Sequence, residues 1–240
     1  ASAALAESAR RAADRCAAGA PFAYAVRRSA FRHMTLDVDE RVLIPRQETE
    51  MLPEIVLELT GGGAGVAVDV GTGSGAIALS LATEGAFECV IATDLSLDAL
   101  AVARRNVELL DGALRASVEL RHGSGLAPLA AERARGDRVR AIVSNPPYIA
   151  FDEMGHLPAS VRDWEPTVAL CCGGEGMDVT VALVRDAAEL LESGGVLALE
   201  VDARRAALAA ERVASDGRYH EVAVRLDLAG RERFVVARRS

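Results

Sequence analysis

Asn145, Pro146, Pro147 and Tyr148, which follow Ser144, have the residue types with the most specific chemistry in this chain. Each proline fixes φ and lacks an N–H donor, so the backbone carbonyls of the segment are free to face a ligand. The Asn145 side-chain carbonyl and a proline carbonyl are two acceptors, which match the two hydrogens of an –NH2 group on an sp² carbon. Tyr148 offers an aromatic face to such a planar group. The segment therefore predicts a site for an amide-type nitrogen.

Holding both hydrogens of such a group has a chemical consequence. An amide or aromatic amine nitrogen is a poor nucleophile because its lone pair is delocalised. Two acceptors favour pyramidalisation of the nitrogen and direct its lone pair toward an electrophilic carbon, so positioning supplies much of the rate. No strong general base is required before transfer, since the proton can leave afterwards. The alternative interpretation, a rigid turn without chemistry, is disfavoured by a loop that comes earlier in the chain.

That earlier loop is rich in glycine and joins a buried strand to a helix. Its glycines allow positive φ and a close approach of the backbone to a ligand, and the helix that follows offers free N–H groups. Asp94 ends the next strand, where a carboxylate can accept hydrogen bonds from both ribose hydroxyls of a nucleotide-like ligand. The alternatives are structural, with Asp69 capping the loop and Asp94 capping a helix. The loop runs Asp69-Val70-Gly71-Thr72-Gly73-Ser74-Gly75.

The glycine-rich loop and Asp94 together predict a binding site for a cofactor. The geometry suits NAD and S-adenosylmethionine alike, whereas the absence of Lys-Ser or Lys-Thr after the glycines excludes a phosphate-cradling P-loop. The predicted site for an amide-type nitrogen at Asn145–Tyr148 favours S-adenosylmethionine, because the sulfonium methyl group of this cofactor is already activated for transfer to a nitrogen. The predicted cofactor-binding residues are Asp69, Gly71, Thr72, Gly73, Ser74, Gly75, Asp94 and Asn145.

The order of the expected elements brings both loops to one edge of a sheet. Strands that alternate with helices indicate an α/β fold with a mostly parallel sheet covered on both faces. Ligands of such sheets bind beyond the carboxyl ends of the strands. A turn at 227–230 between the last two strands predicts an antiparallel edge. Strands are expected at 66–70, 89–92, 118–120, 139–144, 195–201, 220–226 and 233–237, and helices at 76–82, 97–110, 177–191 and 203–214.

The region before the first of these strands has a different pattern. An Ala-rich run with an apolar stripe predicts a helix at 2–18. Alternation from 31 to 44 predicts a short hairpin or extended arm, with Asp37–Glu40 between its halves. A helix is expected at 48–59. We expect two units, residues 1–45 as an N-terminal helix with a hairpin arm and residues 46–240 as the catalytic domain.

Composition limits the class of protein. The 240 residues, of which 50% are hydrophobic, suffice for one sizeable α/β core. A net charge of −8 argues against direct binding of nucleic acid through its phosphates. The four cysteines form no C-x-x-C pair and no His lies at ligand spacing, so no metal site is expected. No apolar run has the length of a membrane span and no signal-peptide pattern is present, so a cytoplasmic location without membrane partners is expected.

The two loops resemble those of class I methyltransferases that modify planar nitrogens, and other segments narrow the family. Val42–Glu50 is similar to the "LIPRPETE" segment of the HemK/PrmC family, the protein-(glutamine-N5) methyltransferases of peptide chain release factors. The resemblance runs from about residue 20 to the C-terminus. The other matching segments are Pro21–Tyr24 with Phe31, Glu165-Pro166 with Ala169-Leu170 and Gly173–Gly176, and Gly194-Gly195 with Glu200.

The resemblance implies a Rossmann-like fold with a seven-stranded sheet and S-adenosylmethionine as the cofactor. It also implies a release factor as the protein partner, with the glutamine of its Gly-Gly-Gln motif as methyl acceptor. Gly71–Gly75 and Asp94 would hold the cofactor, and Asn145–Tyr148 would be the catalytic segment that holds the glutamine amide. Residues 1–45 would be the remnant of a docking domain, because family members usually carry several helices there.

About 20 residues precede the matching region, where family members usually carry a helical docking domain, and this departure leaves the acceptor open. Three further departures stand in or near the matching segments. Gln47 replaces a Pro, Ser124-Gly125 stands where an acid and an aromatic often flank the adenine, and Asp202-Ala203 replaces a Gly. One alternative is methylation of an amide or amine nitrogen of another protein or a small molecule. Adenine methylation in nucleic acid is disfavoured by the acidic balance of charges. A non-catalytic cofactor-binding subunit is disfavoured because Asn145–Tyr148 is intact.

Overall fold

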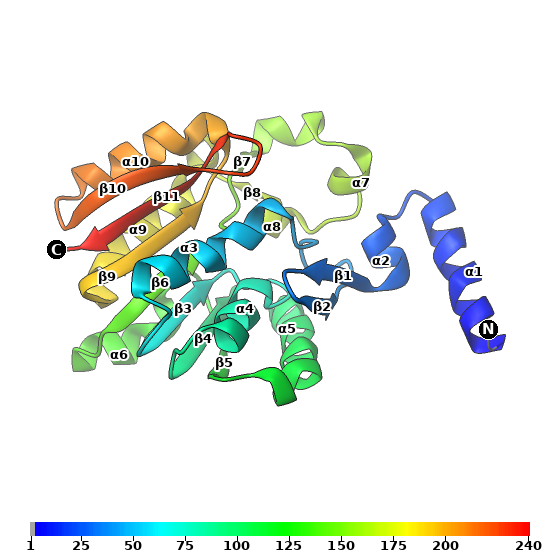
Figure 1. Cartoon of the computed structure of the whole chain (residues 1–240). Helices are drawn as coiled ribbons and strands as arrows, with labels where there is room; N and C mark the ends of the chain where they lie inside the picture. The colour runs from blue at the N-terminus through cyan, green and yellow to red at the C-terminus, as the bar shows by residue number, and fades with distance from the viewer. Residues whose placement is uncertain (1–2) are drawn as a thin grey trace.

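The computed structural model describes residues 3–240, which form a seven-stranded sheet with helices on both faces (Figure 1). The strand order is β10-β11-β9-β6-β3-β4-β5, and the strands from β9 to β5 are parallel. β11 pairs antiparallel with both β9 and β10, so the predicted α/β fold with a closing hairpin is confirmed. The strands are β3 (Val66–Val70), β4 (Cys89–Asp94), β5 (Ser117–His122), β6 (Val139–Ser144), β9 (Leu191–Glu200), β10 (Tyr219–Leu226) and β11 (Glu232–Arg239).

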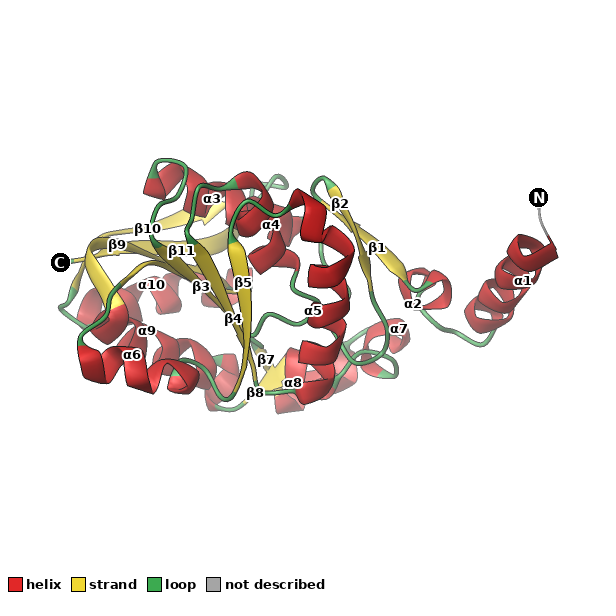
Figure 2. Cartoon of the chain, turned by 90° about the horizontal axis from the view of Figure 1, so that it is seen from below, coloured by secondary structure: helices red, strands yellow, loops and turns green. Residues whose placement is uncertain are grey.

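Alternating side chains give the sheet two buried faces. On β3, Val68 and Val70 pack in the cluster with α9 and α10, whereas Ala67 packs in the cluster with α3 and α4. Figure 2 shows α6, α9 and α10 on one side of the sheet and α3, α4 and α5 on the other. The helices are α3 (Met51–Thr60), α4 (Ala76–Glu84), α5 (Leu97–Leu110), α6 (Ala130–Arg135), α9 (Asp178–Leu190) and α10 (Ala206–Ser215).

The chain reverses its direction across the sheet beside β3. It proceeds from β3 to β4 and β5 on one side, and then crosses to β6 on the other side of β3. Such a reversal leaves a crevice outside the carboxyl ends of the central strands. The glycine-rich loop follows β3, Asp94 ends β4 and Asn145 follows β6. All three predicted segments therefore meet at one edge of the sheet.

The N-terminal region begins with a helix that projects from the body of the molecule (Figure 1). α1 has no buried residue. It agrees with the helix predicted at 2–18, of which residue 2 lies outside the described residues. The sequence did not indicate the short helix that follows it. The elements of this region are α1 (Ala3–Ala17), α2 (Phe22–Val26), β1 (Arg28–Phe31) and β2 (Met34–Asp37).

The hairpin of β1 and β2 lies earlier in the chain than predicted. Its turn is Arg32-His33, and the prediction of Asp37–Glu40 between the halves is wrong. Arg32 has a positive φ of 50°, although neither turn residue is of a type that favours hairpin turns, and so the sequence gave no signal there. Asp39 pairs instead with Arg105 of α5. Residues 38–47 cross the edge of the sheet as irregular backbone.

Between β6 and α9 the chain forms a segment of short helices and two short strands that lies beside the carboxyl edge of the sheet (Figure 1). Its two short strands pair in parallel. None of its helices is long enough to show a periodic pattern, and the sequence did not predict them. The elements are β7 (Ile149–Ala150), α7 (Ala159–Arg162), α8 (Thr167–Leu170) and β8 (Cys171–Cys172).

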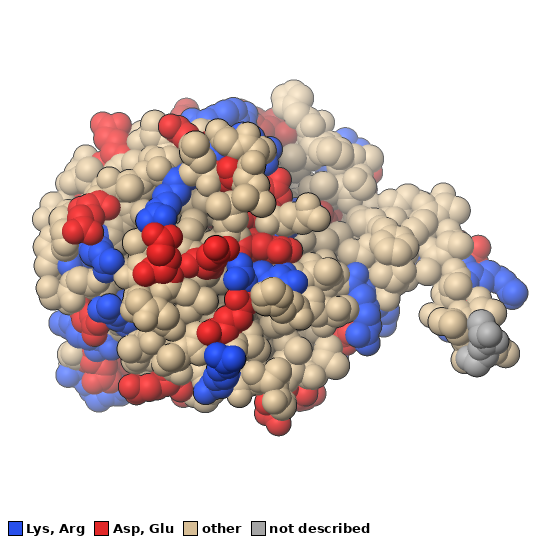
Figure 3. Space-filling model, viewed as in Figure 1, with Lys and Arg blue, Asp and Glu red and all other residues tan. Residues whose placement is uncertain are grey.

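The surface and helix lengths add two observations. On the face shown in Figure 3, basic side chains are interspersed with acidic ones. Over residues 3–240, no helix combines the length and the apolar character needed to cross a bilayer.

Candidate active site

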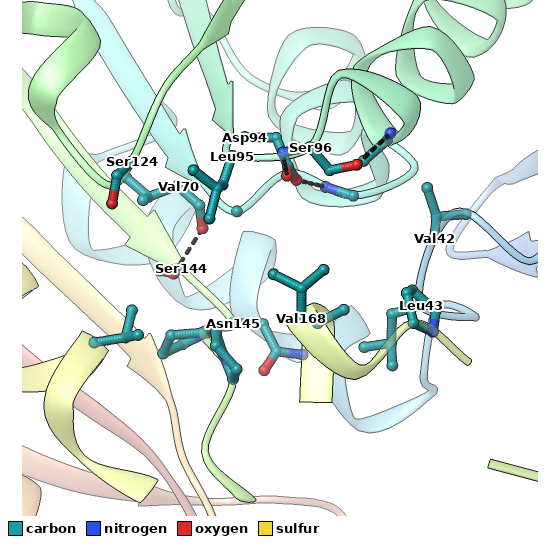
Figure 4. Close-up of a pocket in the computed structure, with 18 of the residues that line it drawn as sticks. Val42, Leu43, Val70, Asp94, Leu95, Ser96, Ser124, Ser144, Asn145 and Val168 are labelled. Atoms are coloured by element: carbon teal, nitrogen blue, oxygen red, sulfur yellow. Dashed lines mark hydrogen bonds between the residues drawn. The ribbon is translucent and has the colours of Figure 1, made fainter. Parts of the chain in front are cut away.

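A cavity of about 280 Å³ opens at the carboxyl edge of the sheet, between the loops that follow β3, β4 and β6 (Figure 4). This volume is close to the lower end of the roughly 300–1,000 Å³ found for small-molecule sites. Asp94 and Leu95 lie on one side of the cavity, and Asn145 and Val168 lie on the other. The predicted site residues that line it are Gly71, Gly73, Asp94, Asn145, Pro146 and Pro147.

The glycine-rich loop is closed by hydrogen bonds to the end of β4. Gly71 N and Thr72 N both donate to the Thr93 carbonyl at 2.9 Å, and Gly73 N donates to Asp94 Oδ2 at 2.9 Å. Gly71 and Gly73 have φ of 74° and 55°, which explains the residue type. A Cβ added at either glycine would meet no protein atom within 4 Å. Because both glycines line the cavity, a side chain there would occupy space that a ligand needs.

Asp69 lies beneath this loop and not in the cavity. Its side chain is fully buried, and Oδ2 accepts from Thr72 Oγ1 at 2.7 Å and from the first turn of α4 at 3.1 Å. Burial raises the pKa of Asp69 to about 7, against the effect of these hydrogen bonds. Thr72, Ser74 and Gly75 are also absent from the cavity wall. The prediction that these four residues contact a cofactor directly does not fit this geometry, because they shape the loop from behind.

Asp94 supports the loop and also faces the cavity. Oδ2 accepts from Gly73 N, and Oδ1 accepts from Ser96 N at 2.8 Å. Burial raises the pKa of Asp94, and these backbone hydrogen bonds oppose the rise. Each carboxylate oxygen has a further lone pair for a ligand donor. Ser96 is the N-cap of α5 and accepts from Ala99 N at 3.1 Å, so Asp94 does not have the capping role that was its alternative.

Asn145 is held by its amide nitrogen. Nδ2 donates to Thr49 Oγ1 at 3.1 Å, and Thr49 belongs to the short 3-10 helix Glu48–Glu50 that precedes α3. The Asn145 carbonyl oxygen is thereby left as an acceptor at the cavity wall.

The two prolines differ in what their carbonyls do. The Pro147 carbonyl accepts a hydrogen bond from the Cys172 thiol at 3.0 Å. Over residues 3–240, the Pro146 carbonyl has no hydrogen-bond partner. The sequence predicted one proline carbonyl as the second acceptor beside Asn145, and the hydrogen bonds favour that of Pro146.

A second cavity of about 190 Å³ adjoins the first. Tyr148 lines this second cavity and not the first, so the predicted aromatic face lies beyond Asn145 as seen from the glycine-rich loop. Burial raises the pKa of Tyr148 to about 12, and the nearby Glu200 carboxyl adds to the rise. The two cavities share the wall residues Leu43, Asn145, Pro146, Pro147 and Ala169.

Residues 41–47, termed the strap, border both cavities. Glu165, whose side chain is 1% exposed, anchors the strap by accepting from Ile44 N at 3.2 Å and from Arg46 at 2.6 Å. Sequence reasoning singled out neither Thr49 nor Glu165 as a site residue. The available signal was that both lie in segments that carry the family resemblance.

Comparison with known proteins identifies related chains. A family model described as methyltransferase small domain matches residues 27–156. A release factor glutamine methyltransferase from Moorella thermoacetica is 43% identical, over 94% of this chain and 77% of that protein. One from Enterococcus faecalis is 35% identical, over 90% and 75%. A methyltransferase structure from Pyrococcus furiosus superposes with a TM-score of 0.61 at 21% identity, over 85% of this chain and 87% of that one.

The fold, the edge of the sheet that holds the cavity and the matched family model define a class I methyltransferase, an enzyme that uses S-adenosylmethionine. The chain belongs to the family of release factor glutamine methyltransferases, as the resemblance in its sequence indicated.

Proposed function

We propose that this enzyme methylates the side-chain amide of the glutamine in a Gly-Gly-Gln motif of a peptide chain release factor. The relatives named for that reaction cover most of the chain, which supports the proposal. The observation that carries it is the wall of Asn145 and Pro146 between two adjoining cavities. A methyl donor in the larger cavity and a planar amide in the smaller one would meet at this wall.

The larger cavity suits S-adenosylmethionine. Gly71 and Gly73 give it a backbone surface without side chains, and Asp94 offers carboxylate oxygens to the two ribose hydroxyls. The mostly apolar wall near Leu95 suits an adenine ring, and Ser124 stands beside it in place of the acid that the family often has. When bound, S-adenosylmethionine supplies a methyl group that its sulfonium has already activated.

The residues of the wall act by positioning. Asn145 Oδ1 and the Pro146 carbonyl accept the two N–H groups of the acceptor amide, which favours a pyramidal nitrogen and points its lone pair at the larger cavity. Tyr148 packs on the planar amide from the smaller cavity. With a pKa of about 12, Tyr148 remains a neutral phenol at physiological pH. The amide proton leaves after transfer, so the wall needs no strong base.

Asn145→Ala tests this arrangement. The variant loses one of two acceptors, and we expect methyl transfer to fall by about 10²–10³-fold, the loss seen when one oriented transition-state contact is removed. Cofactor affinity, measured by calorimetry, should stay near the wild-type value because Asp94 and the glycine-rich loop are untouched. Wild-type activity in Asn145→Ala would contradict the assigned role.

The acceptor is tested separately from the cofactor. If S-adenosylmethionine gives no heat of binding to the wild-type protein, the assignment of the larger cavity fails. If it binds and a release factor stays unmodified, the acceptor is an amide or amine of another protein or of a small molecule.

For the division into units, we propose a boundary near residue 20 in place of residue 45. Tyr24, Phe31 and Leu36 are fully buried, and they pack in clusters with residues of α4 and α5. Residues 20–44 thus share the core of the catalytic domain. Only α1, without a buried residue, has the character of a separate unit.

A further inference from the structure

A third cavity adjoins the smaller cavity that is proposed to hold the acceptor amide. Its volume is about 350 Å³, and it shares the wall residues Tyr148, Ile149 and Leu157 with that smaller cavity. Because only two methylene groups separate the amide of a glutamine from its main chain, a peptide bound there must place main-chain atoms close by. We term the third cavity the flanking cavity. Its other wall residues are Glu153, His156, Asp202 and Arg204.

Two neighbouring arginines beside the flanking cavity have different surroundings. The Arg205 side chain is 12% exposed, and it donates to the Glu175 carbonyl at 2.6 Å and to Glu153 Oε2 at 2.7 Å. It is packed so closely that a Cβ on Gly176 would come within 2.9 Å of its Nε. Arg205 therefore builds the wall, whereas Arg204, with a side chain that is 66% exposed, is accessible to a ligand.

Arg204 is held in place and still has donors for a ligand. Nε and Nη2 donate to the Asp202 carboxylate at 2.9 and 3.2 Å, and Nη1 donates to Glu153 Oε1 at 2.8 Å. A guanidinium has five N–H groups, so two of them are without a partner within residues 3–240. Asp202 Oδ2 and Glu153 Oε1 each accept one of these bonds and have a further lone pair. The flanking cavity thus offers donors and acceptors side by side.

The carboxylate that orients Arg204 comes from a departure of this chain from the family pattern. Asp202-Ala203 stands where the family usually has a glycine, and the φ of −62° at Asp202 is accessible to any residue. Without a carboxylate at position 202, the Arg204 side chain would lose two of its three hydrogen bonds. The position of Arg204 at the flanking cavity is therefore a property of this chain's own sequence.

The charges of the cluster favour an uncharged, polar occupant. Because the carboxylates of Asp202 and Glu153 flank the guanidinium, an acidic ligand would meet repulsion beside its attraction to Arg204, and a basic ligand would meet the reverse. A peptide main chain carries neutral N–H and C=O groups in alternation, which match the acceptors and donors of the cluster. Glycine residues present these groups without a side chain in the way. A glycine-containing main chain therefore fits the cavity.

We propose that the flanking cavity is a subsite for the peptide main chain next to the methylated glutamine, and that Arg204, oriented by Asp202 and Glu153, binds its carbonyl oxygens. The inference rests on the proposed function, because it takes the smaller cavity as the site of the glutamine amide. It makes Arg204 a residue that determines the preference for a peptide over a small amide.

Two acceptors of different length test the subsite. One is N-acetylglutamine methylamide, which has no flanking residues, and the other is a capped peptide that extends the Gly-Gly-Gln motif by a few residues at each end. With the wild-type enzyme, we expect the KM for the peptide to be about tenfold lower, the value of one or two hydrogen bonds to a charged group. Arg204→Ala should lose this advantage through KM and not through kcat.

Arg185→Ala is the matched control. The Arg185 side chain is also 66% exposed and pairs with a carboxylate, that of Asp186 at 2.7 Å, but it lies on α9 and borders neither cavity. This variant should retain the advantage of the longer acceptor. Both variants should unfold near the wild-type temperature. A lower melting temperature in Arg204→Ala, with a parallel fall of kcat and of S-adenosylmethionine affinity, would show a structural role and overturn the proposal.

Photo-cross-linking locates the peptide without depending on catalysis. Two peptides, with benzoylphenylalanine on one side of the motif or on the other, are irradiated with the enzyme and S-adenosylhomocysteine, and the adducts are mapped by mass spectrometry. We expect one of the two peptides to form adducts within Phe151–Leu157 or Asp202–Arg205, the segments that line the flanking cavity. Adducts of both peptides in other segments only would overturn the subsite.

The outcomes separate this inference from the proposed function. If the wild-type enzyme methylates neither a release factor nor the peptide, the proposed function fails and the subsite fails with it. If the release factor is methylated and Arg204→Ala retains the advantage of the longer acceptor, or the wild type shows none, the subsite is wrong and the proposed function stands.

Discussion

Two uncharged oxygens at the wall between the cavities carry the proposed chemistry, those of Asn145 and Pro146. Their surroundings are mostly apolar, and in such surroundings a hydrogen bond is stronger than in water. Buried residues support them from behind, since the Thr49 hydroxyl contacts Asn145 and the Cys172 thiol donates to the Pro147 carbonyl. In the proposed mechanism, the protein contributes mainly the orientation of a few atoms, and not the strength of an acid or base.

Gly71 offers a clean test of the cofactor cavity at the residue scale. Gly71→Ala places a methyl group in ligand space at a φ of 74°. The left-handed backbone costs about 1 kcal/mol for alanine, and the occupied space should weaken S-adenosylmethionine binding by at least about tenfold. Gly136→Ala is the matched control, since its φ is 80° and its Cβ also meets nothing within 4 Å, but it ends α6 away from the cavity.

Calorimetry measures the affinity of these two variants for S-adenosylmethionine, and thermal unfolding measures their stability. Both should lose similar stability, and only Gly71→Ala should lose cofactor affinity. Equal affinities for the cofactor in the two variants would contradict the placement of the ligand against the loop.

Residue types and strand ends in the sequence were enough to predict six residues of the cavity wall. Tyr148, which the sequence predicted to face the planar acceptor group, lines the adjoining cavity, because the rigid Pro146-Pro147 pair carries the chain past the wall. The sequence signals misplaced Asp69, whose burial beneath the loop depends on packing that no spacing shows. Thr49 lies 96 residues before Asn145, so its contact with the site could be found only in three dimensions.

The strap is the element that Glu165 anchors near the cavities, while the Tyr24 hydroxyl holds its beginning by donating to the Val42 carbonyl at 2.6 Å. Residues 41–47 have no regular structure, and Glu165 binds both the Ile44 amide and the Arg46 guanidinium. Because the strap borders both cavities, its order should affect the entry of the acceptor.

Glu165→Gln tests the strap. The neutral amide cannot bind Ile44 N and Arg46 with the strength of a carboxylate, so we expect a stability loss of about 1–3 kcal/mol, reduced because Arg46 is one-third exposed. The Ile44 amide should exchange its hydrogen faster, and the KM for the release factor should rise about tenfold. Asp163→Asn, an exposed partner of Arg162 in the same segment, is the control.

A faster exchange at Ile44 with an unchanged KM would show that the strap has no part in acceptor binding. Unchanged exchange would show that Glu165 does not anchor it.

The sequence predicted the helices and strands that have a clear apolar pattern, and it did not predict those that lack one. Four of the five parallel strands, β3, β4, β6 and β9, contain runs of apolar residues that predict their positions, whereas β5 has only Val118 and Leu120 as apolar residues. The hairpin turn Arg32-His33 lacked the residue types that mark turns, and α7 and α8 are too short for a helical period. The strap and the segment from β7 to β8 therefore escaped prediction, although both border the site.

At the scale of the whole molecule, the strand order creates the site. Placing β6 on one side of β3 and β4 on the other brings three loops from distant parts of the chain to one edge. This convergence was predictable from the alternation of strands and helices. The division of the edge into two adjoining cavities was not, because it depends on how the strap and the segment after β6 pack.

Removal of residues 1–19 tests the proposed unit boundary. α1 has no buried residue, and its partly exposed Arg15–Glu40 ion pair is of a kind worth about 1 kcal/mol or less. We therefore expect an unfolding free energy within about 1 kcal/mol of the full chain and an unchanged cofactor affinity. If α1 contacts the release factor, KM for the factor should rise while activity on a short Gly-Gly-Gln peptide stays the same. Loss of the fold would place the boundary elsewhere.

Mass spectrometry of a purified release factor, after incubation with this enzyme and S-adenosylmethionine, tests the central claim most directly. We expect one added methyl group on the glutamine of the Gly-Gly-Gln motif with the wild-type enzyme. With Asn145→Ala that has bound the cofactor, we expect none above about 1% of the wild-type extent. An unmodified glutamine with cofactor-bound wild-type enzyme, or equal modification by both proteins, would contradict the account.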